Sequence, residues 1–172
     1  MILLFKVAMK RILLSISFLV LLISACQPIF ENHKSEATVD PVSARRALLR
    51  YFEILYQKNY DQVETIFGGD LQVLLEYNPD VRLDQVGKLF ESACTINGFQ
   101  CLAIKNILDE KKIDDFNFVF MVEFQTNEGD LFVLGPCCGA TAQEMPPVSQ
   151  FPIRVSWKNG EYRVMDLPPY VP

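Results

Sequence analysis

The fold is decided by the stretch FNFVFMVEFQ, residues 116–125. Successive side chains of a β-strand point to opposite sides of the sheet, so an alternation of large apolar residues marks a strand with one apolar face. The alternate positions here make an almost wholly aromatic face, formed by Phe116, Phe118, Phe120, Val122 and Phe124. We therefore expect a sheet whose aromatic face is covered by another part of the chain.

Segments with strand character lie on both sides of this stretch. The predicted strands cover residues 101–108, 116–125, 131–134, 151–158 and 162–167. A polar turn over 109–115 separates the first two, and a loop rich in Pro, Gly and small residues covers 135–150. Asn159-Gly160 suits a type I′ turn, so the last two strands should form a hairpin. The pattern predicts an antiparallel meander.

We expect the segment that begins at Asp40 to cover the sheet, because apolar residues recur in it at the three- and four-residue steps of a helix. Asp40-Pro41 suits the beginning of a helix, because Asp can cap it and Pro fits its first position. The apolar stripe of this helix consists of Leu48, Leu49, Phe52, Leu55 and Tyr56. Two shorter helices are predicted over 59–67 and over 84–93, the latter capped by Asp84, while 70–77 fits either a helix or a strand.

Helices followed by antiparallel strands predict an α+β domain with its N-terminal helices packed on a curved antiparallel sheet. This order, together with the pattern of residues 51–55 and 60–67, resembles the cone-shaped nuclear transport factor 2-like superfamily, which includes ketosteroid-isomerase-like proteins. The resemblance covers residues 40–168, although the short strand usual between the second and third helices is indistinct. It implies a concave sheet face that can hold a ligand.

The N-terminus has the three parts of an export signal. Lys10-Arg11 forms a basic patch, residues 12–25 form an uncharged, mainly apolar run of 14, and small residues precede Cys26. A helix that crosses the hydrocarbon needs roughly 20 residues, so a permanent transmembrane anchor is disfavoured. Translation from Met1 or from Met9 would leave the same signal.

Ile23-Ser24-Ala25-Cys26 resembles the lipobox of bacterial lipoproteins. The resemblance implies cleavage before Cys26 and a membrane anchor through lipid on its sulfur; the alternative is an ordinary signal peptide with an incidental cysteine. The predicted organisation is a signal peptide over 1–25, a lipidated flexible tether over 26–39 and a single α+β domain over 40–172. The domain would face the periplasm or the exterior from the cell membrane or the outer membrane.

The charge of the chain excludes one class of partner. The net charge is −5, and removal of the first 25 residues, with three basic residues and no acid, makes it −8. Scattered basic residues on an acidic chain do not make the positive surface that nucleic acid requires. His33 is the only histidine and lies in the tether, so neither a Ser–His or Cys–His nucleophile nor a histidine-based zinc site is expected. No cofactor is expected.

Four cysteines remain after Cys26, and outside the cytosol they should be oxidised. In the predicted meander the first and third strands run parallel, so Cys94 and Cys101 lie at one end of the sheet and Cys137 and Cys138 at the other. The ends are roughly 17–23 Å apart, whereas a disulfide needs Cα atoms about 4.4–6.8 Å apart. We therefore predict Cys94–Cys101 and a vicinal Cys137–Cys138 disulfide. The vicinal ring could stiffen a turn, face a ligand or act as a redox switch.

The phenylalanines allow two interpretations, a filled core or the lining of a cavity for an apolar ligand. The candidate lining is Phe52, Phe116, Phe118, Phe120 and Phe124. The preferred hypothesis is a non-catalytic domain that binds a small apolar ligand or an envelope protein. One alternative is an isomerase-like or cyclase-like enzyme using a pocket carboxylate such as Glu123 or Asp166. Another is a structural module that works through the sheet face or the 136–150 loop.

The lipid anchor predicts the behaviour of one variant. Cys26→Ser removes the only sulfur that can carry the lipid, so acylation should be lost and the protein should leave the membrane pellet after carbonate extraction. Labelling with a radioactive fatty acid, followed by fractionation, measures both effects. A variant that stays acylated and membrane-bound would contradict the prediction.

Overall fold

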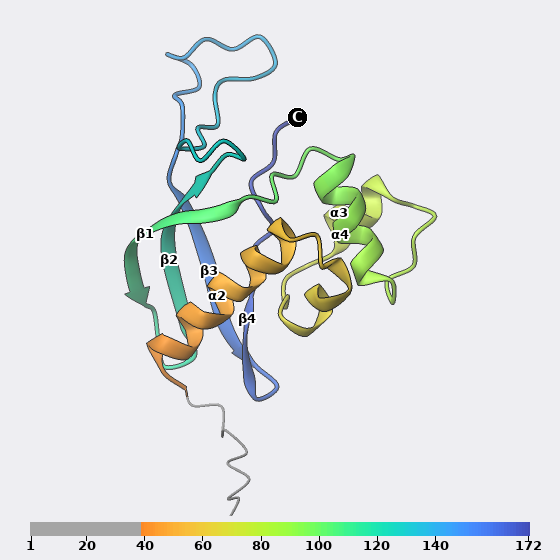
Figure 1. Cartoon of the computed structure of the whole chain (residues 1–172), viewed down its shortest axis with the longest axis vertical. Coiled ribbons are helices and arrows are strands. Elements are labelled where there is room, and N and C mark those ends of the chain that lie inside the picture. The colour runs from red at the N-terminus through yellow and green to blue at the C-terminus, as the bar shows by residue number, and fades with distance from the viewer. Residues whose placement is uncertain (1–38) are drawn as a thin grey trace, which may run out of the picture. The chain divides into compact units, whose positions relative to one another are not determined.

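The computed structural model of the protein describes residues 39–172. The predicted signal peptide, the lipobox with Cys26 and the tether up to residue 38 lie outside the described residues. Within the part that is described, four antiparallel strands form a sheet and the helices precede it in sequence (Figure 1). The α+β class with N-terminal helices on an antiparallel sheet is confirmed. No helix among residues 39–172 combines the length and apolarity needed to cross a membrane.

Helix α2, Pro41–Tyr56, begins as the sequence predicts. The Asp40 side chain accepts a hydrogen bond from the backbone N–H of Ser43 at 2.9 Å, which satisfies one of the free donors at the helix start. The buried face of α2 consists of Ala44, Ala47, Leu48, Tyr51, Phe52, Ile54 and Leu55. Leu49 and Tyr56, expected on that face, are 45% and 41% exposed, so the apolar stripe is rotated from the predicted one.

Three short helical segments follow α2. They are the 3-10 helix η1, Tyr60–Thr65, and the α-helices α3, Gln72–Tyr77, and α4, Val86–Thr95. The segment that fitted either a helix or a strand is therefore helical. The prediction that Asp84 caps the third helix is wrong: α4 begins at Val86, and Asp84 pairs with Arg82 at 2.7 Å.

The sheet contains β1, Ala103–Lys112, β2, Asn117–Gln125, β3, Phe151–Lys158, and β4, Glu161–Val164, in that order. Strand β2 alternates as predicted, since Phe118, Phe120, Val122 and Phe124 are all buried. Helix α2 lies across this face of the sheet (Figure 1), and Phe52 packs against Phe124 with ring centroids 4.8 Å apart. The aromatic face is thus covered by α2, as the sequence indicates.

One predicted strand is absent, and the bounds of the first and last strands are wrong, since β1 begins at Ala103 and β4 ends at Val164 and not at Leu167. Residues 131–134 form no strand of the sheet and make only isolated bridges, Gln125↔Leu131 and Leu134↔Val148. As a result β3 pairs directly with β2, and the whole segment 126–150 leaves the sheet between them. Strand β1 also continues to Lys112 through most of the predicted polar turn.

The irregular register of β1 explains why its sequence does not alternate. Ile104, Ile107 and Glu110 pair with Phe124, Val122 and Phe120, and the register shifts between Ile104 and Asn106 and again between Ile107 and Asp109. Directly paired residues in antiparallel strands point to the same side of the sheet. Positions three residues apart therefore share the inner side of β1, because each irregularity adds one residue.

The hairpin of β3 and β4 turns at Asn159-Gly160, as predicted. Both residues have positive φ, +53° and +89°, which is the backbone of a type I′ turn. Trp157 and Tyr162 pair directly across it, with ring centroids 5.0 Å apart. The turn residues therefore fix the register of the two strands.

The glycines after η1 allow a close contact with β4. Phe67 forms a parallel bridge with Val164, and the Gly68 N–H donates to the Val164 carbonyl at 2.9 Å. A Cβ atom on Gly69 would lie 2.2 Å from the carbonyl oxygen of Met165. Only glycine lets the two backbones approach in this way. The edge of β4 is partly covered as a result.

The aromatic face of β2 predicts the effect of two neighbouring substitutions. Phe120→Ala should lower the free energy of unfolding by about 3–5 kcal/mol, because it leaves a cavity in the core. Met121 points to the outer side of the same strand, so Met121→Ala should cost about 1 kcal/mol or less. Chemical denaturation followed by circular dichroism gives both values, and equal losses would contradict the assignment of the inner face.

Candidate functional site

The five candidate phenylalanines fall into two groups. Phe52, Phe120 and Phe124 are at most 1% exposed and pack among the side chains of the core. Phe116 lies just before β2, is 52% exposed, and lines a pocket together with Phe118. The expectation that Phe116 shares the buried face is wrong, because the strand begins one residue later.

The pocket lies between the beginning of α2 and the turn that joins β1 to β2. Its volume is about 310 Å³, at the lower end of the range of roughly 300–1,000 Å³ for small-molecule sites. The lining residues are Val39, Asp40, Pro41, Lys112, Asp115, Phe116 and Phe118. Phe118 is nearly fully buried, so it supplies part of the apolar wall from within the core. The lining thus combines four apolar residues with the charged side chains of Asp40, Lys112 and Asp115.

The charged groups of the pocket already have partners within the domain. Asp40 caps α2 through Ser43, and Asp115 pairs with Lys112 at 2.7 Å. The neighbouring carboxyl of Asp114 accepts hydrogen bonds from the Asn117 side chain and the Phe116 N–H, and these bonds lower its pKa. These contacts hold the turn that presents Phe116. The rim of the pocket is therefore ionic and internally paired.

Tyr162 brings an unpaired polar atom close to the same region. Its side chain is 4% exposed and its hydroxyl has no hydrogen-bond partner among the described residues. The ring makes an edge contact with Phe118 at a centroid distance of 5.7 Å. Burial raises the pKa of Tyr162, and the carboxylates of Asp40 and Asp114 add to the effect. The hydroxyl is thus a neutral donor beside the pocket.

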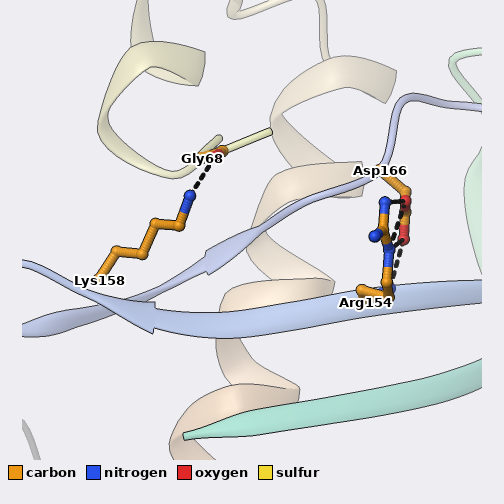
Figure 2. Close-up of polar contacts among 4 residues, drawn as sticks. All are labelled: Gly68, Arg154, Lys158 and Asp166. Atoms are coloured by element: carbon orange, nitrogen blue, oxygen red, sulfur yellow. Dashed lines mark hydrogen bonds and ion pairs between the residues drawn. The ribbon is translucent and has the colours of Figure 1, made fainter. Parts of the chain in front are cut away.

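The two carboxylates considered as general bases lie elsewhere. Glu123 is on the outer side of β2 and accepts a hydrogen bond from the Asn106 side chain at 2.9 Å. Asp166 accepts from the backbone N–H of Arg154 at 2.6 Å and from its guanidinium (Figure 2), and the pKa of Arg154 is raised by this contact. Neither carboxylate lines the pocket of Phe116 and Phe118.

A second contact in the same view joins the hairpin to the segment after η1. The Lys158 ammonium donates to the Gly68 carbonyl at 2.9 Å (Figure 2). The Arg154–Asp166 and Lys158–Gly68 contacts therefore join neighbouring segments of the fold. Among residues 39–172, no group of three or more His, Cys, Asp or Glu side chains is arranged to hold a metal ion.

The cysteines form two pairs of different character. Cys94, at the end of α4, and Cys101, just before β1, stand at disulfide distance with Cα atoms 5.5 Å apart. The Sγ atoms of Cys137 and Cys138 lie 2.9 Å apart, and the contact with Cys138 raises the pKa of the Cys137 thiol. The vicinal disulfide stays a prediction.

One premise of the predicted pairing is wrong. Ala103 at the start of β1 pairs with Gln125 at the end of β2, and segment 126–150 leaves the sheet there. No strand over 131–134 carries Cys137 and Cys138 to the opposite end. The predicted third strand would lie between β2 and β3, which pair directly with each other in the structure.

Comparisons with known proteins give no assignment. A search with protein-family models finds no match to the chain, and a comparison with curated proteins finds none either.

Tyr51 is a buried polar residue that the sequence does not reveal, because its position fits an ordinary apolar stripe. It is 0% exposed, and its hydroxyl has no hydrogen-bond partner among residues 39–172. Its ring stacks on Phe67 with centroids 5.8 Å apart. Burial raises the pKa of Tyr51 well above its usual value, and Asp166 raises it further. A buried hydroxyl without a partner costs stability.

This observation predicts that Tyr51→Phe raises the free energy of unfolding by about 1 kcal/mol, because it removes the unpaired hydroxyl. Burial keeps the Tyr51 hydroxyl protonated in the folded state, whereas in the unfolded chain it ionises near pH 10. The free energy of unfolding of the unaltered protein therefore falls as the pH rises above about 10. The variant should therefore lose less stability in alkali. Tyr56→Phe, on the exposed side of α2, should change stability by about 0.5 kcal/mol or less. A clear loss in Tyr51→Phe would show that the hydroxyl has a partner.

Proposed function

We propose that this protein is a lipid-anchored protein of the bacterial cell envelope, whose exported domain binds a small apolar ligand without catalysis. The observation that carries the proposal is the pocket lined by Phe116 and Phe118. A ligand that covers the exposed ring of Phe116 removes apolar surface from water, which favours binding. The carboxylates of the pocket are held by Ser43 and Lys112, which favours binding over acid–base chemistry.

The cysteines support the proposed location independently of the N-terminus. Cys94 and Cys101 stand at disulfide distance across a short loop. Disulfides persist in oxidising compartments such as the periplasm and the cell exterior, and they are rare in the cytosol. The lipobox sequence Ile23-Ser24-Ala25-Cys26 adds the anchor to this argument.

Membership of the nuclear transport factor 2-like superfamily is part of the proposal. The order of α2, η1, α3 and α4 before an antiparallel sheet supports it. At the place of the short strand between the second and third helices, the chain has only the bridge Phe67↔Val164. The resemblance implies a concave sheet face that can hold a ligand, and the pocket of Phe116 and Phe118 lies where β2 begins.

A protein partner is a second candidate, favoured by the segment between β2 and β3. Leu131, Val133 and Val148 are 39%, 49% and 43% exposed on it. Exposed apolar side chains on a projecting segment suit contact with another protein.

The ligand hypothesis is tested on protein extracted from membranes without denaturation. Native mass spectrometry should show a small molecule bound at one per chain. Phe116→Ala should reduce its occupancy at least fivefold, because the substitution removes one apolar wall. Leu108→Ala is the matched control, since Leu108 is 47% exposed on β1 and does not line the pocket.

The outcomes separate the two candidates. A bound molecule that survives in Phe116→Ala would contradict the proposed pocket. Absence of any small molecule, with a protein retained by the unaltered chain and lost on Val133→Ser, would favour the protein partner.

A further inference from the structure

The vicinal cysteines lie in a well-defined turn between β2 and β3. The N–H of Ala140 donates to the Cys137 carbonyl at 2.9 Å, and the two residues between them have positive φ, +58° for Cys138 and +86° for Gly139. This is the backbone of a type I′ turn. Cys137 and Cys138 therefore occupy its first two positions.

Cys138 is an unfavourable residue for this position. Left-handed backbone is uncommon for residues other than glycine, and Asn or Asp tolerates it best. A Cβ atom on Gly139 would have no neighbour within 4 Å. Glycine is therefore needed at this position for its positive φ, and not because another group lies close to it. A strained residue in an otherwise open turn suggests that its side chain is needed. What Cys138 adds is a second sulfur beside Cys137.

The two sulfurs are positioned for oxidation. Their Sγ atoms are 2.9 Å apart and a disulfide requires about 2.05 Å, so the sulfurs must approach by less than about 1 Å, while the peptide bond inside the resulting eight-membered ring adjusts to the disulfide dihedral angle. Cys138 is exposed, and Cys137 is partly exposed, so an external thiol has access to the pair. The turn thus presents two accessible sulfurs that can form or open one bond.

The Cys94–Cys101 pair has a different setting. Both of its cysteines pack against the hydrophobic core, and the intervening loop is held by bonds to the C-terminal segment, including Val171 N–H to the Gly98 carbonyl at 3.0 Å. Exposed or strained disulfides are the more easily reduced, whereas packed structural ones resist reduction. The same chain therefore contains a stable reference pair.

We propose that Cys137 and Cys138 form a reversible thiol–disulfide exchange site for external thiols, an activity beyond ligand binding and independent of the Phe116 pocket. In the oxidised form, an external thiolate attacks one sulfur of the pair, which forms a mixed disulfide and releases the other cysteine as a thiol. A second external thiol then attacks the mixed disulfide. The products are two cysteine thiols on the protein and one external disulfide. The reverse sequence oxidises the pair.

The test is a redox titration of the full lipoprotein in glutathione buffers. After acid quenching and alkylation with N-ethylmaleimide, peptide mass spectrometry reads both pairs in the same sample. The Cys137–Cys138 peptide should pass from disulfide to doubly alkylated thiols in one step. Its midpoint should occur at a ratio of [GSH]² to [GSSG] at least tenfold lower than the midpoint for Cys94–Cys101.

Cys138→Asn is the matched variant, because asparagine suits the left-handed position and preserves the turn. It should leave Cys137 forming only a mixed disulfide with glutathione, with Cys94–Cys101 unchanged. The proposal is overturned if Cys137 and Cys138 stay reduced at every ratio, carry two separate glutathione adducts, or are reduced together with Cys94–Cys101.

Discussion

The packing of the aromatic face of β2 against α2 is the interaction on which the rest of the domain depends. Phe120, Val122 and Phe124 present one continuous buried apolar surface, and Phe52 of α2 packs against Phe124 on it. Each buried aromatic side chain removes a large apolar area from water, and such burial supplies most of the favourable free energy of folding. The neighbouring strands β1 and β3 extend the surface on either side of β2.

The pocket follows from where this packing ends. Helix α2 begins at Pro41, whereas the apolar character of the β2 region continues outward through Phe118 to Phe116. Beyond the beginning of the helix, no residue of α2 remains to cover Phe116, and a space of about 310 Å³ is left. Among residues 39–172, the proposed binding site is thus the end of the core that α2 does not cover. The ion pair of Lys112 with Asp115 holds the turn beside it.

The elements with regular periodicity could be predicted from the sequence. They include α2 with its Asp40 cap, the inner face of β2 and the type I′ hairpin at Asn159-Gly160. The sequence does not predict the last part of β1, because the two irregularities place its inward-facing residues three apart. This spacing lacks the alternation by which a strand is recognised. Residues 131–134 form an apolar run of four, which is too short for periodicity to distinguish a strand from an apolar loop.

The candidate site was predictable only in part. The alternation of residues 116–125 indicates Phe116 and Phe118 as candidate lining residues. It does not show that the strand begins between them, at Asn117. The remaining lining, from Val39 and Pro41 to Lys112 and Asp115, comes from segments far apart in sequence. Their meeting depends on how α2 crosses the sheet, which no local pattern specifies. The Cys94–Cys101 pair agrees with the prediction although the predicted strand over 131–134 is absent, because only a short loop separates the two cysteines.

Amide hydrogen exchange of the native, disulfide-intact protein tests the central role of this packing most directly. If the β2–α2 interface holds the domain together, the amides of β2 and of the middle of α2 should exchange only through global unfolding, and those of segment 126–150 much faster. Slow exchange in 126–150 that equals that of β2, or fast exchange throughout β2, would contradict the account.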